Sequence, residues 1–307
     1  MKIGIIGLGS IGRRHVACLQ SLGINDIVAL RTNKGQLKAA VSGVKEVDNW
    51  DEFLALNLEA AIIANPSSMH AETIANIETR GIRTLVEKPI HSSSDFEVSD
   101  AFKAQIRVAY CLRFHPLYVF MGELLDKNPN AKLSLSFERG YALPKWHPYA
   151  DYRKEYSAQK ALGGGVVRTL SHEIDLFIHW FHEASLISSK VWKASDLEID
   201  VEDHAEFALE SQKARAEFHL DFVNPEYTNK GKLSLDEQTY SFDFVKQNLI
   251  EDSTQKKLFE FSKEDLDMMY VEQMRDFLGF VKTGKSINCS FEEAMQSIKL
   301  IEQIAPH

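Results

Sequence analysis

The chain is poor in cysteine, in proline and in long apolar runs. Its 307 residues include three cysteines and eight prolines. Cys18, Cys111 and Cys289 are far apart and show no C-x-x-C spacing, which argues against a disulfide framework and a cysteine-based zinc site. No apolar run approaches the ~18 residues of a membrane span, and no charged-then-apolar leader precedes the first apolar segment. We therefore expect a cytoplasmic protein in a reducing compartment.

Positive charge is also in deficit. Thirty-five basic side chains stand against 44 acidic ones, giving a net charge of −9, which disfavours binding to nucleic acid and to acidic membrane surfaces. The apolar fraction of 44% supports substantial cores, and the length exceeds that of most single domains. The composition predicts a two-domain protein whose ligands are small molecules.

A glycine pattern opens the chain, in residues 1–14, MKIGIIGLGSIGRR. A short apolar strand runs into G-x-G-x-x-G, with Gly7 in the tight turn, Gly9 where a pyrophosphate approaches the backbone, and Gly12 where helix packs on strand. The amides of Ser10 and Ile11 open the helix and face the anion. A glycine turn in an ordinary α/β protein is the alternative, but helical spacing after the turn favours a dinucleotide-binding βαβ unit.

The next strand, residues 27–30, ends in Arg31 and Thr32. An NAD-preferring site commonly has an acidic residue here for the adenosine ribose. A guanidinium and a hydroxyl suit a 2′-phosphate better, because they supply charge and donors where a carboxylate repels. The pair therefore favours NADP over NAD, with a solvated surface pair as the alternative.

Two further buried strands deliver polar residues to one sheet edge. Residues 60–64 are fully apolar and end at Asn65-Pro66, and residues 84–86 lead into Glu87 and Lys88. The carboxyl ends of parallel strands meet at the edge where ligands bind in doubly wound sheets. A surface lysine is the alternative for Lys88.

Four segments in this order resemble the Gfo/Idh/MocA family of nicotinamide-dependent oxidoreductases: GLGSIGRRH, ANPSSMH, VEKP and AYCLRFHP. The resemblance implies that Lys88, the lysine of the E-K-P motif, lies beside the nicotinamide and the substrate hydroxyl. It implies that Asn65, Pro66, His70 and Glu87 line the cofactor. Arg113, within the fourth segment, is expected to contact substrate. Cys111 departs from the polar amide often found after the family's tyrosine.

In the second half of the chain apolar and polar residues alternate with a period of two, most clearly over residues 214–222. Residues 133–137, 190–192, 205–209 and 240–244 behave similarly, which predicts a mostly antiparallel sheet. We expect a Rossmann domain over residues 1–116 and an α+β domain over 117–307 with a large sheet, the last helices packing back on the first domain. Ser262 with Asp265, and Ser290 with Glu293, are typical of helix starts. The resemblance implies a homodimer or homotetramer formed through the sheet.

A loop rich in aromatic residues follows residue 140. Its rings surround Arg153 in the sequence: Tyr141, Trp146, Tyr149, Tyr152 and Tyr156. Such rings stack on the apolar faces of sugars while a guanidinium binds a carboxylate or phosphate. An aromatic cluster that anchors a long loop is an equal alternative. On the sugar-stacking interpretation we predict that Trp146, Tyr152 and Arg153 contact the substrate.

Three glycines then lead into a helix on which Arg168, His172 and Asp175 are predicted to share one face. On pattern alone a histidine among apolar residues is a core residue. The resemblance instead implies that His172 exchanges the substrate hydroxyl proton. Asp175, the aspartate of the H-x-x-D motif, is expected to orient His172 or to bind a substrate hydroxyl. Arg168 occupies the family's first acidic position, and we expect it either to bind an anionic substrate group or to mark lost catalysis. No zinc-type spacing emerges, so no metal is expected.

Together these patterns predict an NAD(P)-dependent oxidoreductase that moves a hydride between nicotinamide and a secondary alcohol or ketone of a sugar or sugar derivative, acidic or nucleotide-linked. The alternatives are a non-catalytic dinucleotide-binding regulator and a transient-redox lyase or glycosidase of the same fold.

Overall fold

The computed structural model describes residues 1–31, 37–148, 150–261 and 267–306. They form two compact units, one of residues 1–111 with 267–295 and one of residues 112–266 with 296–307. Thr32, Tyr149, Ser262 and Asp265, which carried sequence expectations, lie outside the described residues.

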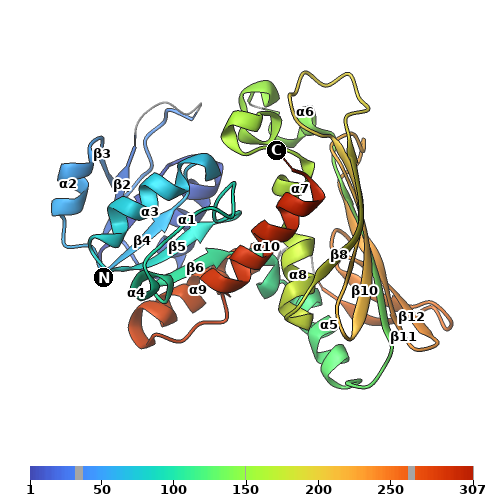
Figure 1. Cartoon of the computed structure of the whole chain (residues 1–307). Helices are drawn as coiled ribbons and strands as arrows, with labels where there is room; N and C mark the ends of the chain where they lie inside the picture. The colour runs from blue at the N-terminus through green and yellow to red at the C-terminus, as the bar shows by residue number, and fades with distance from the viewer. Residues whose placement is uncertain (32–36, 149, 262–266, 307) are drawn as a thin grey trace. The chain divides into compact units, whose positions relative to one another are not determined.

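The first unit is built on a parallel sheet that, within the described residues, has seven strands in the order β15-β6-β5-β4-β1-β2-β3, and only β15 is antiparallel (Figure 1). The strands are β1 (Ile3–Ile6), β2 (Ile27–Leu30), β3 (Val44–Val47), β4 (Ala60–Ile63), β5 (Arg83–Glu87), β6 (Ile106–Ala109) and β15 (Cys289–Ser290). The order around β1 is that of a doubly wound dinucleotide-binding sheet.

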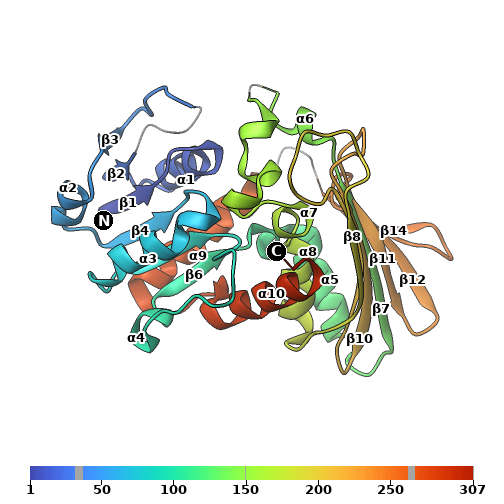
Figure 2. The ribbon, with the colours of Figure 1, turned by 45° about the horizontal axis from the view of Figure 1, so that its top comes forward.

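Helices cover both faces of this sheet. They are α1 (Ser10–Ser21), α2 (Trp50–Ala55), α3 (His70–Glu78), α4 (Asp100–Lys103) and α9 (Met268–Thr283). Ile3 and Ile5 pack with Leu19 of α1 and Phe277 of α9, while α3 lies on the opposite side (Figure 2). Strands buried on both faces explain the continuous apolar runs in the sequence.

The second unit contains a sheet for which the described chain supplies eight strands, in the order β14-β13-β12-β11-β7-β10-β9-β8. They are β7 (Leu133–Gly140), β8 (Ser185–Trp192), β9 (His204–Glu210), β10 (Ala214–Asp221), β11 (Thr228–Leu235), β12 (Gln238–Asp243), β13 (Asn248–Glu251) and β14 (Lys256–Glu260). Neighbours are antiparallel except β7 and β10. The predicted fold class, a Rossmann sheet plus a mostly antiparallel sheet, is confirmed.

The two faces of this second sheet differ in chemistry. Phe137 and Phe207 stack on Phe218 on the inner face, with ring centroids 5.1 Å and 4.5 Å from that of Phe218. Helices α5 (Pro116–Asp126) and α8 (His172–Phe181) lie on that side (Figure 1). The other face carries charged pairs, such as Lys230 with Glu138 at 3.2 Å. The alternation in the sequence reflects this division.

The remaining elements of the described chain are the long helix α10 (Phe291–Ile304), the short helices α6 (Leu143–Trp146) and α7 (Val166–Thr169), and the 3₁₀ turns η1 (Ser67–Met69), η2 (Cys111–Phe114), η3 (Tyr152–Lys154), η4 (Tyr156–Ala158) and η5 (Lys160–Leu162). The start of α10 confirms one predicted cap: Ser290 N–H donates to Glu293 Oε2 at 2.8 Å, and Glu293 N–H donates to Ser290 Oγ at 3.2 Å. This is a reciprocal capping box.

Candidate functional site

The glycine turn after β1 is closed on two sides and open on one. Gly7 has φ +98, and a Cβ there would lie 2.8 Å from the carbonyl oxygen of Ala64; one on Gly12 would lie 2.0 Å from the carbonyl oxygen of Gly7. A Cβ on Gly9 would meet no atom within 4 Å. The backbone can therefore be approached by a ligand at Gly9, where the sequence predicted the pyrophosphate.

Helix α1 begins at this opening. Gly9 is its N-cap, no side chain caps it, and its first turn has no acidic residue. The first amides of a helix have no intrahelical acceptor, and the helix dipole adds partial positive charge. The amides of Ser10, Ile11 and Gly12 thus fit a pyrophosphate, which supplies the acceptors and the opposite charge.

Asn65 and His70 lie at the same sheet edge, next to β4. The Asn65 amide donates to Thr73 Oγ1 at 2.8 Å. His70 is 1% exposed, and its ring nitrogens lie 3.0 Å from the carbonyl oxygen of Ile90 and 2.9 Å from that of Asn65. Burial lowers its pKa. The structure thus makes His70 a link between two loops of the edge, which does not support the predicted cofactor contact.

Glu87 is the last residue of β5 and Lys88 follows it, so the strand ends one residue later than predicted. Glu87 Oε1 lies 2.7 Å from Nε2 of His15 on α1, and its Oε2 accepts from the Lys88 amide at 3.3 Å. The Lys88-Pro89 peptide is cis, and the Lys88 side chain is half-buried. No local signal in the sequence reveals that His15 has a partner 72 residues away.

Arg31 is held by protein groups. Its Nη1 donates to Glu46 Oε1 and Oε2 at 3.1 Å and 3.0 Å and to the Ala39 carbonyl at 3.3 Å, and its Nη2 donates to the Leu37 carbonyl. The residue is 6% exposed. This geometry differs from the free guanidinium on which the expectation of NADP rested.

The predicted continuous helix from residue 166 is wrong, because it breaks at Leu170 and Ser171 into α7 and α8. His172 starts α8 and is 7% exposed. Arg168 therefore lies on a different helix. It is 1% exposed and its Nη1 donates to the Ala305 carbonyl at 3.0 Å. A guanidinium inside the unit supports the C-terminal segment, which argues against the predicted contact with a substrate anion.

Asp175 and Arg113 form a buried bidentate pair. Arg113 Nε and Nη2 donate to Asp175 Oδ2 and Oδ1 at 2.8 Å and 2.7 Å. The side chains are 2% and 0% exposed. Such a pair fixes the first turn of α8, which carries His172, against η2. Asp175 and Arg113 are thus structural partners here, a relationship that the sequence did not suggest.

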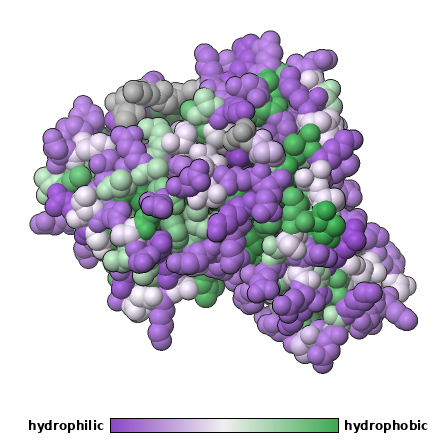
Figure 3. Space-filling model, viewed as in Figure 1, coloured by the Kyte–Doolittle hydropathy of each residue, from purple (hydrophilic) through white to green (hydrophobic). Residues whose placement is uncertain are grey.

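The aromatic loop forms a stack without Arg153. Trp146 lies over Tyr141, with ring centroids 4.4 Å apart, and next to Tyr227, with centroids 5.4 Å apart. Trp146 and Tyr227 are 42% and 39% exposed. We call Tyr141, Trp146 and Tyr227 the aromatic platform. Hydrophilic side chains predominate on the face drawn in Figure 3, with apolar ones scattered among them.

Arg153 is occupied elsewhere. It donates to Asp151 at 2.8 Å and to Glu198 at 2.7 Å, and the hydroxyl of Tyr152 accepts from the Glu198 amide at 3.2 Å. These contacts anchor the loop, as in the alternative reading of the sequence. The cation beside the platform is instead Arg139, whose Nη1 donates to Glu173 at 2.8 Å. Burial works against its charged form, but Glu173 outweighs burial and raises the pKa of Arg139.

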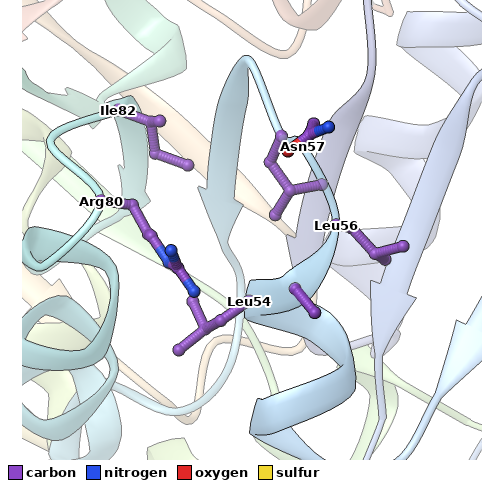
Figure 4. Close-up of a pocket in the computed structure, with 7 residues that line it drawn as sticks. Leu54, Leu56, Asn57, Arg80 and Ile82 are labelled. Carbon is purple, nitrogen blue, oxygen red and sulfur yellow. The ribbon is translucent and has the colours of Figure 1, made fainter.

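Within the described residues, neither a metal-binding cluster nor the depression beside α2 marks the site. Among the described residues no three histidine, cysteine or acidic side chains could hold a metal, and no helix of that part of the chain is long and apolar enough to span a membrane. A depression of about 200 Å³ lies at the amino ends of β4 and β5 (Figure 4). That edge is opposite to the glycine turn, and its lining offers no catalytic group.

The fold and the open glycine turn define a dinucleotide-binding α/β protein with a second, sheet-containing unit. Residues 1–109 match the model of the Gfo/Idh/MocA oxidoreductase family, which has an NAD-binding Rossmann fold. This confirms the resemblance inferred from the motifs.

Curated relatives match over part of their length. The rhizopine catabolism protein MocA of Rhizobium meliloti is 27% identical over 123 residues, which is 38% of this chain and 39% of that protein. D-xylose 1-dehydrogenase (NADP(+)) 2 of Haloferax volcanii is 25% identical over 154 residues, 47% of each chain. The matches thus span about two fifths to a half of these relatives.

Solved structures match over nearly the whole chain. Levoglucosan dehydrogenase in complex with NADH has a TM-score of 0.81 at 16% identity, covering 99% of this chain and 95% of that one. UDP-N-acetylglucosamine 3-dehydrogenase from Acidithiobacillus ferrooxidans has a TM-score of 0.77 at 18% identity, with coverages of 99% and 96%. At these identities the likeness establishes the fold of both units.

Proposed function

We propose that the protein is an NAD(P)-dependent dehydrogenase or reductase that interconverts a secondary alcohol and a ketone on a sugar or sugar derivative. The observation that carries the proposal is the glycine turn, closed at Gly7 and Gly12 and open at Gly9. The sugar dehydrogenases among its relatives support the substrate class. A bound dinucleotide supplies hydride transfer at its nicotinamide.

In this proposal the protein manages charge and protons. The Lys88 ammonium stabilises the developing alkoxide, a contribution of roughly 3 to 4 kcal/mol at comparable donors. The His172 imidazole accepts the hydroxyl proton, since histidine is the side chain used most often as a general base. Asp175, whose two oxygens face Arg113, acts as a positioning residue for the turn that carries His172.

The aromatic platform is the proposed sugar-binding surface. Exposed Trp146 and Tyr227 offer ring faces to the C–H faces of a sugar, and buried Tyr141 supports them from behind. Glu173 already pairs with the nearby Arg139, so the expectation of an acidic or nucleotide-linked sugar is tested with the sugar acids and nucleotide sugars of the assay panel. We expect no nucleic-acid or membrane partner, a cytoplasmic location, and a homodimer or homotetramer formed through the second unit's sheet.

Ligand binding and turnover test this proposal separately. Purified protein is titrated with NADH and NADPH by fluorescence. It is then assayed by the absorbance of the reduced nicotinamide against sugars, sugar alcohols, sugar acids and nucleotide sugars. Lys88→Ala and His172→Ala should each abolish most turnover and retain dinucleotide binding. Matched controls are Lys103→Ala and His219→Ala, which remove exposed side chains of the same types.

Each alternative has its own outcome. Binding without turnover across the panel points to a non-catalytic regulator. Product formation without a net change in nicotinamide absorbance points to a transient-redox lyase or glycosidase. Full turnover in both Lys88→Ala and His172→Ala contradicts the catalytic assignment.

A further inference from the structure

The ion pair between Arg31 and Glu46 lies beside the glycine turn. The Gly7 amide donates to the carbonyl of Leu30 at 3.1 Å. Arg31, the residue after Leu30, therefore lies next to the glycine turn in space. The Arg31 amide donates to the carbonyl of Val47 at 2.9 Å, which fixes the end of β2 against the end of β3. In doubly wound sheets the adenosine ribose lies at this position.

The protein already uses most of the guanidinium. Nη1 faces both oxygens of Glu46 and the carbonyl of Ala39, and Nη2 faces the carbonyl of Leu37. Arginine has five N–H donors in a fixed fork. A phosphate that approached Arg31 would have to displace Glu46 or bind beside it, and the side chain is only 7% exposed.

The surroundings are acidic. A cavity of about 360 Å³ is lined by Arg31, Glu46, Val47, Asp48 and Glu52. It therefore holds three carboxylates for one guanidinium, and Glu52 has its own exposed partner, Lys45, at 3.2 Å. A 2′-phosphate adds a charge of about −1.5 to −2 at pH 7, which the carboxylates repel. A ribose diol is neutral, and its hydroxyls donate to a carboxylate.

We propose that Glu46, held in place by Arg31, selects NAD over NADP by occupying the guanidinium that a 2′-phosphate would need and by accepting from the ribose hydroxyls. This inference rests on the proposed dinucleotide site. It reverses the preference expected from Arg31 and Thr32 in the sequence, because that expectation left out the carboxylate on β3.

The test compares adenosine fragments that need no turnover. Isothermal titration calorimetry measures 5′-AMP and adenosine 2′,5′-bisphosphate, and fluorescence titration measures NADH and NADPH. The unmodified protein should bind 5′-AMP and NADH more tightly than their 2′-phosphorylated counterparts by roughly tenfold or more. Glu46→Gln keeps the shape and removes the charge, and should shift both ratios toward the 2′-phosphate by roughly tenfold.

Glu52→Gln is the matched control, since it removes a carboxylate from the same cavity without touching Arg31. It should shift the ratios less than Glu46→Gln does. Tighter binding of the 2′-phosphorylated ligands by the unmodified protein overturns the inference and leaves the proposed dinucleotide site intact. Equal shifts in the two variants also overturn it. Failure of all four ligands to bind removes the proposed function together with the inference.

Discussion

The imidazole of His15 lies 2.7 Å from the carboxylate of Glu87. His15 is 1% exposed and the Glu87 side chain 12% exposed. The contact ties the helix that follows the glycine turn to the residue before Lys88, and so joins the proposed cofactor and catalytic segments of the first unit.

Replacing His15 by leucine should lower the free energy of unfolding by about 1 to 3 kcal/mol, because Glu87 loses a largely buried hydrogen-bond partner. Urea denaturation of the isolated variant measures this. Arg14→Ala, which removes the neighbouring and half-exposed side chain paired with Asp267, should cost no more than about 1 kcal/mol. Equal losses of unfolding free energy in the two variants would mean that the His15–Glu87 contact stabilises the fold no more than the exposed Arg14–Asp267 pair does.

The Arg113–Asp175 pair should show strong coupling. Asp175→Leu or Arg113→Met alone should cost about 3 to 5 kcal/mol, since each leaves a buried charge without its partner. The double variant should cost much less than the sum. Thermal or urea unfolding of the four proteins in this cycle measures the coupling. The exposed Arg153–Asp151 pair, tested with Arg153→Met and Asp151→Leu, should couple by less than about 1 kcal/mol.

His115 should make the fold sensitive to acid. Its Nδ1 accepts from the Leu117 amide at 3.2 Å at the start of α5, and burial lowers its pKa from 6.5 to about 4. Between pH 6.5 and 4 the unfolded chain takes up a proton that the folded chain does not. The free energy of unfolding therefore decreases as the pH is lowered through this range, by about 3 kcal/mol in all. Below pH 4 both states are protonated and this loss stops.

His115→Asn is the comparison for this pH dependence, because asparagine also caps helices and does not titrate. Urea midpoints measured from pH 7 to pH 4 should fall more steeply for the unmodified protein than for the variant. Parallel curves would exclude His115 as the source.

Two glycines of the turn should respond differently to alanine. Gly9 has φ −69 and open space around its missing side chain, so the Gly9→Ala variant should fold normally. Its affinity for the dinucleotide should fall by roughly tenfold or more, because the methyl group obstructs the ligand. Gly12→Ala places Cβ 2.0 Å from the Gly7 carbonyl oxygen and should destabilise the fold itself. Calorimetric binding and thermal unfolding of both variants separate these effects, and a Gly9→Ala protein with unchanged affinity would contradict the proposed binding mode.

Trp146 should affect substrate binding more than chemistry. Trp146→Leu removes the exposed ring of the platform and should raise KM roughly tenfold with a smaller change in kcat, since stacking is equally present in the ground and transition states. Steady-state kinetics on the substrate found in the panel measure this. Phe259→Leu, at a distant and partly exposed stacked pair of the sheet, is the control, and a kcat effect as large as the KM effect would assign Trp146 a different role.

Features encoded within a few residues could be predicted from the sequence. The glycine turn, the apolar strands of the first sheet, the alternation of β10 and the capping box at Ser290 all depend on local patterns. The break at Leu170 and Ser171 escaped prediction because the apolar spacing continues across it.

The partners of the arginines depend on the tertiary fold. Arg31 meets Glu46 from the neighbouring strand, Arg113 meets Asp175 62 residues later, and Arg168 meets Ala305 137 residues later. A sequence shows that a guanidinium is present but not which acceptor satisfies it, and buried arginines are almost always paired. The roles of arginines are therefore the hardest part of the site to predict from the sequence.

The first unit is assembled from two distant stretches of chain. Arg83 donates to the carbonyls of Phe280 and Val281, each at 2.6 Å, and α9 covers one face of the sheet whose strands begin at Ile3. During translation, that face is covered by α1 but still lacks α9 while the ribosome produces residues 112–266. The nucleotide-binding fold starts first and is completed late, so premature termination within the second unit yields a nascent chain with a partly exposed apolar sheet.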